Sequence, residues 1–337
     1  MADHVIAEIP ILRCRVLSLA LSWKCDAHCL HCFLPRRIRQ RDAYEPEVVH
    51  SVLAHLPDEV SLVSLTGGEP FLEPKRLLDV LSRIDAHGRI AAIVTNGLWS
   101  RDWQKARKLL GTAFRLGLRI FSLSLDEYHR PALSDQEAIR LLREAVQLGM
   151  EVSLKGTGRF ARKKWARVSS HPDLSSVRVR PGWENLETIG TGRGLPADHQ
   201  RGPSTMRDCG TVLLPLVLPD GRFMACCSTL MFQAKGTWLD VGTVREEPID
   251  RLIDRYRRSF LLAGLFVFGP LGFLRRVGIS RRPDQETKCG FCLGWLKDQE
   301  ICRKVADRLG VDMALKKEIV ARVMLFEHTR SVEPCCE

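Results

Sequence analysis

The chain has 337 residues and a formal net charge of +11, a length sufficient for one large domain or two modest ones with a sizeable core. Its twelve cysteines follow no secretory signal, because residues 1–10 carry acids and lack a sustained apolar run. We therefore expect a cytoplasmic protein whose cysteines bind metal rather than form a disulfide framework. The positive charge fits an acidic partner. We find no motif of basic and aromatic residues of the kind that binds nucleic acid.

Short apolar runs alternate with helical segments over the first two thirds of the chain. The predicted strands are 16–21, 60–65, 90–94, 119–125, 151–154 and 185–189. The predicted helices are 46–55, 74–87, 101–116, 135–148 and 159–168. The first two begin with proline, which fits a first helical turn. Repeated strand and helix units predict a parallel sheet covered by helices, with functional residues at the carboxyl ends of the strands.

Three cysteines follow the first predicted strand at the spacing CxxxCxxC, namely Cys25, Cys29 and Cys32. Three thiolates on one short loop can bind three irons of a four-iron four-sulfur cluster and leave the fourth iron open to a ligand. The alternative is a structural zinc site, with His28 or His31 as the fourth ligand.

Glycines and polar residues follow the next three predicted strands. They are Thr66-Gly67-Gly68-Glu69-Pro70, then Thr95-Asn96-Gly97, then Ser122, Ser124 and Asp126 on one face of the fourth strand. Paired glycines permit a close backbone approach by a ligand, and a neighbouring carboxylate can hold an ammonium group. Simple turns are the alternative for each motif taken alone.

As an ordered set, these motifs resemble the radical S-adenosylmethionine (SAM) enzymes over about residues 12–195. The resemblance implies an α/β fold, a partial (β/α)6 barrel of the TIM type, in which the three cysteines hold a 4Fe-4S cluster and SAM binds its open iron. The SAM-binding residues that it implies are Gly67, Gly68, Glu69, Thr95, Asn96, Ser124 and Asp126. One departure is His31, which stands where the family often has a large aromatic residue.

The chemistry implied by this resemblance is radical formation. One electron from the reduced cluster cleaves SAM, and the 5'-deoxyadenosyl radical removes a hydrogen atom from an unactivated carbon. An electron donor such as flavodoxin or ferredoxin is then an expected partner. Glycine-rich segments at 155–158 and 190–194 allow either contact with the cofactor or tight turns, and residues 196–207 have the composition of a linker.

A second group of cysteines follows the linker. A β-hairpin is predicted from 212–218 and 222–225 around the turn Pro219-Asp220-Gly221. The cysteines are Cys209 before the hairpin, Cys226 and Cys227 after it, and the CxxC pair Cys289 and Cys292. Their spacing resembles the SPASM and twitch extensions, which bind auxiliary iron–sulfur clusters.

Counting ligands favours the shorter twitch type of extension. Cys209, Cys226, Cys289 and Cys292 suffice for one fully ligated auxiliary 4Fe-4S cluster, with zinc as the alternative. Whether Cys226 or Cys227 is the ligand stays open. Cys227 and Cys302 are candidate catalytic residues that could return a hydrogen atom to a substrate radical, and the alternative is that they are merely buried or adjacent thiols.

Residues 255–283 carry seven arginines and no acidic residue around an apolar run at 260–274. Glycines and a proline interrupt this run, which is too short for a membrane span. We expect a helical cap over the barrel mouth, with a helix lying on a membrane surface as the alternative. Segments 294–309 and 313–327 have the pattern of packing helices.

The predicted organisation is a radical SAM barrel at 1–195, an auxiliary-cluster domain at 196–302, and a C-terminal helix and tail at 303–337. We expect an enzyme that matures a ribosomal peptide, with a separate protein as a candidate for peptide recognition. The alternatives are a dehydrogenase or epimerase of a small molecule, a sugar or cyclitol of the aminoglycoside type, and a non-catalytic iron–sulfur or zinc scaffold.

Overall fold

The computed structural model describes residues 6–34, 43–129, 131–156, 159–174, 180–183, 208–228, 230–282 and 287–332. The chain forms two units, which we call the barrel unit and the C-terminal unit. The barrel unit contains Leu17–Asp198 and Leu218–Asp220, and the C-terminal unit contains Met1–Val16, His199–Val217 and Gly221–Glu337. Residues 6–16, predicted to lie with the barrel, therefore belong to the C-terminal unit.

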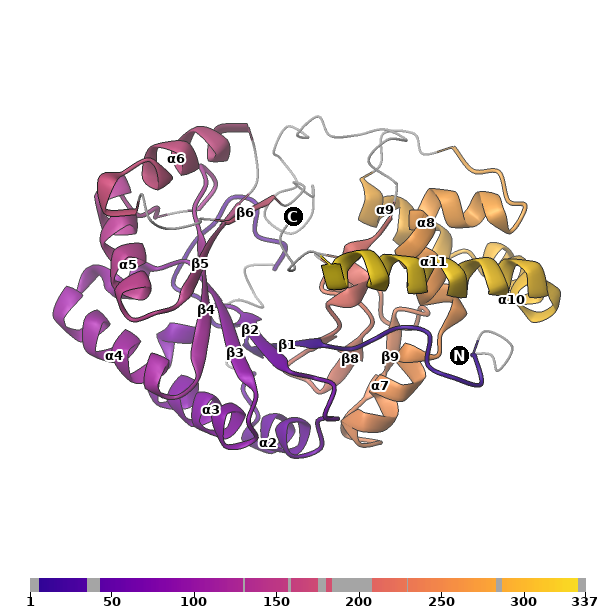
Figure 1. Ribbon diagram of the computed structural model, residues 1–337, viewed down its shortest axis with the longest axis horizontal. Coiled ribbons are helices and arrows are strands. Elements are labelled where there is room, and N and C mark those ends of the chain that lie inside the picture. Colours follow the sequence, from indigo (N-terminus) through magenta and orange to yellow (C-terminus); the bar gives the residue numbers. More distant parts are fainter. Residues whose placement is uncertain are drawn as a thin grey trace. The chain divides into compact units, whose positions relative to one another are not determined.

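The barrel unit is built on strands in the order β6-β5-β4-β3-β2-β1 (Figure 1). They are β1 (Val16–Ser22), β2 (Leu62–Gly67), β3 (Ile90–Thr95), β4 (Leu118–Ser124), β5 (Glu151–Gly156) and β6 (Arg180–Trp183). All pairs from β2 to β6 are parallel. The first five strands confirm the predicted ones to within two residues. The sixth lies earlier than predicted, and 185–189 fall outside the described residues.

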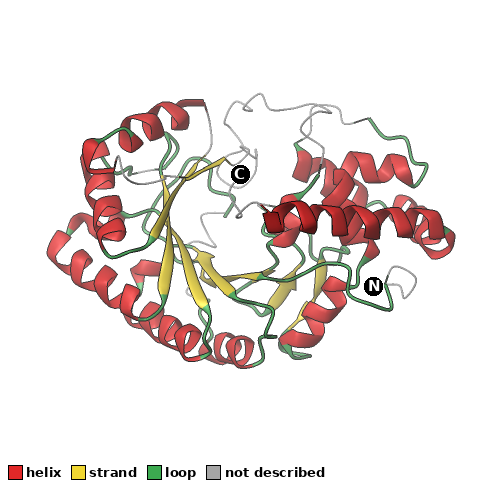
Figure 2. Ribbon diagram, in the orientation of Figure 1, coloured by secondary structure: helices red, strands yellow, loops and turns green. Residues whose placement is uncertain are grey.

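Helices cover the outer side of these strands (Figures 1 and 2). They are α2 (Pro46–Ala54), α3 (Pro74–Ala86), α4 (Trp103–Arg115), α5 (Asp135–Gln147) and α6 (Arg159–Ser169). Pro46 and Pro74 occupy first helical turns as predicted. Ser134 and Glu137 form a capping box that starts α5. The predicted α/β architecture of a partial (β/α)6 barrel is confirmed.

The core of the barrel unit lies between the strands and these helices. Val63, Ile93 and Phe121 on successive strands are fully buried. Helix α3 turns Leu77, Val80, Leu81 and Ile84 inward, at the spacing of one helix face. Because apolar side chains fill this core, the polar motifs gather where the strands end.

The C-terminal unit joins a small antiparallel sheet, β7-β8-β9, to five helices. Its elements are the 3-10 helix η7 (Gly210–Leu213), β7 (Leu216–Val217), β8 (Arg222–Met224), β9 (Asp240–Thr243), α7 (Ile249–Arg257), α8 (Phe260–Arg276), α9 (Lys288–Leu296), α10 (Gln299–Val311) and α11 (Met313–Val332). The predicted hairpin exists, but its first strand is shorter. The amide of Val212 donates to the carbonyl of Cys209 (3.1 Å), so this stretch turns before it can extend.

The helical pattern predicted near the C-terminus is divided differently in the structure. The predicted helix at 294–309 is two helices, α9 and α10, because Asp298 caps a new start. The second predicted segment, 313–327, lies within α11.

Helix α8 is buried inside the C-terminal unit, where it contacts α11, α9 and η7. Gly269 has φ 67° and ψ 171°, so it breaks the helix before Pro270. Gly264 leaves room for the Phe273 ring, which would lie 2.3 Å from a Cβ atom there. The apolar run predicted as a cap thus forms part of this unit's core.

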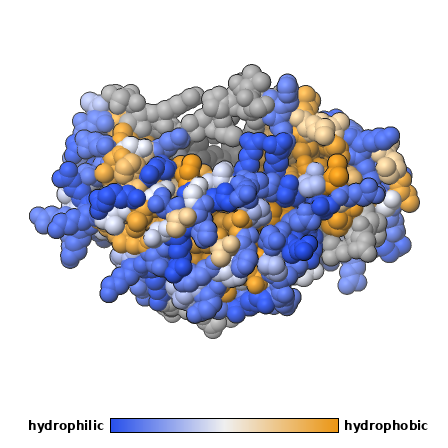
Figure 3. Space-filling model, turned by 60° about the horizontal axis from the view of Figure 1, so that its bottom comes forward, coloured by the Kyte–Doolittle hydropathy of each residue, from blue (hydrophilic) through white to orange (hydrophobic). Residues whose placement is uncertain are grey.

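Several of the flanking arginines pair with carboxylates. Arg255 contacts Glu247 at 2.7 Å and Arg258 contacts Asp254 at 2.8 Å, while Arg276 pairs with Glu318. Within the described part of the chain, no helix is long and apolar enough to cross a membrane. The face drawn in Figure 3 is largely hydrophilic, with apolar residues in smaller areas.

The N-terminal segment is held by main-chain contacts at the junction of α7 and α8. Ile6 forms an antiparallel bridge with Ser259, and the Ala7 amide donates to the Arg258 carbonyl (2.7 Å). The Leu12 amide donates to the carbonyl of Arg257 (2.9 Å). Residues 6–12 and 257–259, far apart in the sequence, therefore lie side by side in one unit.

Candidate functional site

The cysteine loop follows β1 at its carboxyl end. Cys29 is buried, and Cys25 and Cys32 are half-buried. The Ala27 amide donates to Cys25 Sγ (3.4 Å), and the Cys32 amide donates to the Cys29 carbonyl (3.4 Å). These contacts fold the loop into short turns that keep the three cysteines together.

Gly67 and Gly68 lie where β2 meets the end of β1. A Cβ atom on Gly68 would stand 2.0 Å from the Lys24 carbonyl oxygen, and one on Gly67 would stand 2.4 Å from that of Ser22. The Gly68 amide donates to the Ser22 carbonyl (2.7 Å), and the Glu69 amide donates to that of Lys24 (2.8 Å). The close backbone approach expected for this pair is thus made by the chain itself, at the start of the cysteine loop.

The buried carboxylate of Glu69 is fixed by three donors. Its Oε1 accepts from the Phe71 amide (3.0 Å) and the Thr95 hydroxyl (2.8 Å), and its Oε2 accepts from the Asn96 amide (2.8 Å). Burial raises the pKa of Glu69 to about 7, against the effect of these hydrogen bonds. The carboxylate therefore keeps one orientation at the joined ends of β2 and β3.

Asn96 connects the end of β3 to the cysteine loop. Its Nδ2 donates to Asp26 Oδ1 (3.0 Å) and lies 3.7 Å from Cys25 Sγ. Asp26 was not singled out from the sequence, although its place between two cysteines was the available signal. Asn96 thus contacts the loop directly, whereas Thr95 contacts Glu69, and cofactor binding by both stays a prediction.

The donor set on this loop suits an iron–sulfur cluster. Burial raises the pKa of Cys25 to about 12, and Glu69, Cys29 and Asp26 act in the same direction. A free thiol here keeps its proton, and a bound metal takes the proton's place, because the thiolate is the metal-binding form. Cys25, Cys29 and Cys32 would hold the cluster in this loop.

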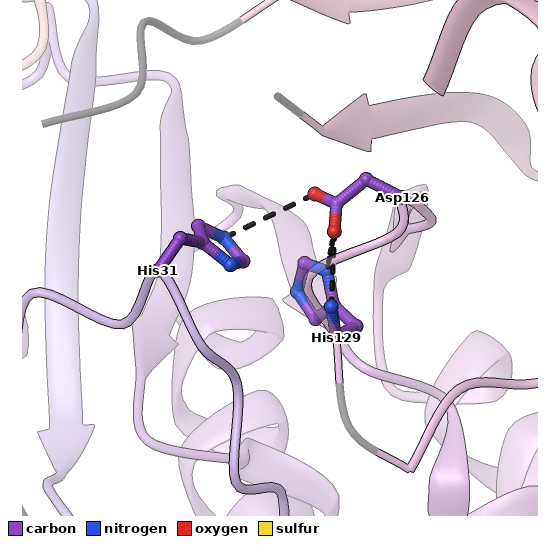
Figure 4. Close-up of side chains that lie close together, drawn as sticks. All are labelled: His31, Asp126 and His129. Atoms are coloured by element: carbon purple, nitrogen blue, oxygen red, sulfur yellow. Dashed lines mark hydrogen bonds and ion pairs between the residues drawn. The ribbon is translucent and has the colours of Figure 1, made fainter. Parts of the chain in front are cut away.

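Asp126 joins the cysteine loop to the segment after β4, as Figure 4 shows. Its Oδ1 accepts from the amides of Tyr128 (2.9 Å) and His129 (3.0 Å) and from His129 Nδ1 (2.7 Å). His31 Nε2 lies 3.9 Å from Asp126 Oδ2. We call His31, Asp126 and His129 the clasp, because Asp126 lies between His31 of the cysteine loop and His129 of the segment after β4.

Within the clasp, Asp126 is ionised and His31 is neutral. Burial opposes ionisation of Asp126, but the hydrogen bond and charge of His129 lower its pKa to about 2. Burial lowers the pKa of His31 to about 4, so His31 is neutral. One ligand atom from each residue lies within 4.8 Å of the others, a spacing that also suits a metal ion. In this structure Asp126 Oδ1 is a hydrogen-bond acceptor for three N–H groups of Tyr128 and His129. The Leu30 amide of the cysteine loop donates to the Tyr128 carbonyl (2.9 Å), which joins the same two segments.

Asp126→Asn is expected to loosen the cysteine loop. An amide would replace the charged acceptor that orders Tyr128 and His129, and the Tyr128 carbonyl in turn accepts from Leu30 of the loop. Hydrogen bonds to charged groups contribute about 1.5–3 kcal/mol each, so faster amide exchange at Leu30 and Cys32 is expected in mass-resolved hydrogen exchange. Asp79→Asn is the control, since this exposed carboxylate pairs with Arg83 and His50 on the surface. Equal exchange in both variants would contradict the role of Asp126.

The two serines of β4, predicted to share one face, have different surroundings. Ser122 is buried and shares a 2.7 Å hydrogen bond with Ser153 of β5, whereas Ser124 is half-buried at the strand end. A Cβ atom on Gly156 would lie 3.0 Å from the Leu125 carbonyl oxygen, so this glycine also packs against the chain itself. Residues 157–158 and 190–194 lie outside the described residues. His129, which completes the clasp, was missed because its only sequence signal is its place three residues after Asp126.

The second group of cysteines meets within the C-terminal unit. A cavity there is lined by Cys209, Cys226, Cys289 and Cys292, together with mostly apolar side chains. Burial raises the pKa of Cys226 and Cys292 well above the usual range, and the nearby Cys209 and Cys289 act in the same direction. Four thiols that line one cavity, of which that of Cys226 is buried and the other three are half-buried, suit a fully ligated metal cluster, and they also suit zinc.

The candidate hydrogen donors lie elsewhere in this unit. Cys227 and Cys302 are half-buried, and neither is among the described residues that line the cavity. Cys302 Sγ donates to the Leu296 carbonyl (3.4 Å), which places it at the junction of α9 and α10. Their catalytic role stays a prediction. The cavity is lined by Cys226 rather than Cys227.

The partial barrel and its cysteine loop define an iron–sulfur enzyme. Residues 21–159 match the model of the radical SAM superfamily. Residues 21–159 therefore form a radical SAM domain, in an enzyme whose cofactors are a 4Fe-4S cluster and SAM. When bound, they supply a 5'-deoxyadenosyl radical that removes a hydrogen atom from the substrate. The clasp, Glu69 and Asn96 hold the residues that would bind them.

The chain is also similar to individual proteins. It is 21% identical over 279 residues to YydG of Bacillus subtilis strain 168, whose full name is "Putative peptide biosynthesis protein YydG", and the match covers 77% of this chain and 82% of YydG. Among solved structures, it is similar to Streptococcus suis SuiB bound to precursor peptide SuiA (14% identity, TM-score 0.46, 85% of this chain and 77% of SuiB). It is also similar to BtrN in complex with AdoMet and 2-DOIA (18% identity, TM-score 0.43, 74% and 89%).

Proposed function

We propose that this radical SAM enzyme modifies a peptide, with an auxiliary iron–sulfur cluster bound by Cys209, Cys226, Cys289 and Cys292. The observation that supports the peptide class is the match to YydG, which covers 77% of this chain. That share is larger than residues 21–159, so the similarity extends beyond the domain that all radical SAM enzymes have in common. The four-cysteine cavity supports the auxiliary cluster.

Within this proposal, the barrel unit starts the reaction and the C-terminal unit receives the electron that an oxidised substrate releases. A flavodoxin or ferredoxin would reduce the cluster in the barrel, and a separate protein would present the peptide. Glu69 is placed to accept the ammonium of SAM, since its carboxylate is buried and already oriented.

Radical formation is expected to depend on the cysteine loop. After anaerobic reconstitution, dithionite and SAM should yield 5'-deoxyadenosine, measured by liquid chromatography. The variant Cys25→Ala/Cys29→Ala/Cys32→Ala should fall to the level without enzyme, because the cluster has lost its ligands. Equal yields from both proteins would rule out the radical reaction and leave a metal-holding scaffold.

The substrate class is tested by first searching the genes that flank this one for a short precursor peptide and then incubating that peptide with the reconstituted enzyme and SAM. A peptide lighter by a pair of hydrogen atoms indicates a crosslink or oxidation, and one solvent deuterium retained in the product indicates epimerisation. If 5'-deoxyadenosine forms and the peptide is unchanged, while a sugar or cyclitol is converted, the peptide proposal is wrong.

A further inference from the structure

The two cysteine sites have neighbours of opposite charge. Beside Cys25 lie two carboxylates, those of Asp26 and buried Glu69, which disfavour added negative charge on the sulfur. Beside Cys209 lies the ammonium group of Lys288, and none of the described residues lining that cavity is a carboxylate. Because reduction adds an electron, carboxylates lower the reduction potential of a cluster and cations raise it.

The loop around Cys209 adds hydrogen-bond donors to this charge. Thr211 and Lys288 line the same cavity as Cys209. The Thr211 hydroxyl and the Lys288 ammonium group both favour negative charge on the Cys209 sulfur. Donors of this kind stabilise negative charge on a cysteinyl sulfur, and more so after reduction.

Lys288 occupies a position that is unfavourable for the helix itself. It is the first residue of α9, where the positive end of the helix dipole disfavours a cation. Its Nζ donates to the Asp208 carbonyl (2.8 Å), which holds it beside the Cys209 loop. A local rule broken in this way is typical of a functional position, here one that faces an anionic group.

We propose that Thr211 and Lys288 raise the reduction potential of the auxiliary cluster, so that it accepts electrons more readily than the cluster in the barrel. The substrate carbon gives a hydrogen atom to the adenosyl carbon, and the radical left behind gives one electron to the auxiliary site and one proton to solvent. The electron then leaves to an oxidised flavodoxin or ferredoxin. Thr211 and Lys288 are positioning residues that touch no substrate atom, and this inference rests on the auxiliary cluster of the proposed function.

The test is a reductive titration of the full chain in the Cys25→Ala/Cys29→Ala/Cys32→Ala background, which leaves only the auxiliary site. The midpoint is read from the electron paramagnetic resonance of the reduced cluster. Lys288→Gln should lower the ratio of reduced to oxidised cluster at a fixed potential about tenfold, which is 59 mV for one electron. Thr211→Val, which removes only the hydroxyl, should lower it in the same direction.

Two variants control for charge and structure. Lys297→Gln removes the same charge from the exposed end of α9 and should leave the midpoint unchanged. Lys288→Arg keeps the cation and a donor for Asp208, so it should restore most of the midpoint. An unchanged midpoint in both Lys288→Gln and Thr211→Val, with the cluster intact, would overturn the inference alone. A background protein that binds no iron would overturn the auxiliary cluster and the inference together.

Discussion

Cys226→Ser is expected to remove about four irons from the reconstituted chain, whereas Cys227→Ser should leave the iron content unchanged. The reason is geometric, because Cys226 is buried and lines the cavity with three other cysteines, and Cys227 does not line it. The difference should be largest in the variant that lacks the three cysteines of the barrel, where all the iron belongs to the auxiliary site.

Elemental analysis and the absorbance of the cluster measure this result. Zinc is measured in the same samples, since a site that takes up zinc and no iron after reconstitution would point to a structural metal. Iron loss in Cys227→Ser that equals the loss in Cys226→Ser would contradict the assignment of Cys226 as the ligand.

Gly68→Ala is expected to disrupt the barrel unit near its site, because the new methyl group would lie 2.0 Å from the Lys24 carbonyl oxygen. The Lys24 oxygen is a main-chain atom and the position of a Cβ atom is fixed by its own backbone, so no side-chain rotation relieves the contact. Overpacking of this kind costs about 3 kcal/mol and at times more. The displaced segment leads into Cys25, so loss of the cluster in the barrel is also expected.

Thermal unfolding and iron content check this prediction. Gly111→Ala is the matched control, because Gly111 lies inside α4 and a Cβ atom there would meet only the Arg115 guanidinium at 3.8 Å. Alanine at such a position should raise stability by about 0.5–1 kcal/mol. A Gly68→Ala protein with unchanged melting temperature and full iron would show that the backbone yields more readily than this packing indicates.

The first five strands could be predicted because each carries a short run of apolar residues, of which at least alternate ones are buried. Strand β6 is the exception, since its sequence Arg180-Pro181-Gly182-Trp183 contains two residues that weaken a strand. It pairs with β5 at the edge of the parallel strands, where proline is tolerated. Pairing with β5 makes this segment a strand although its proline and glycine disfavour one. The sequence of the segment itself does not reveal which strand it pairs with.

The order of the site motifs was predictable, whereas their contacts were not. The sequence placed Gly67, Gly68 and Asp126 near a cofactor, but the structure shows that they also hold the cysteine loop. Such contacts depend on how two loops meet in space. For the same reason Asp26 and His129 could not be recognised from their types and spacing alone.

The N-terminal segment has a consequence for how the chain is made. Its hydrogen-bonding partners, Arg257 to Ser259, lie about 250 residues later in the sequence. At a synthesis rate of about 5–20 residues per second, the segment waits roughly 10–50 s before those partners emerge from the ribosome. The barrel unit can fold during that interval, so residues 6–12 dock on their partners only after the barrel sequence has been made.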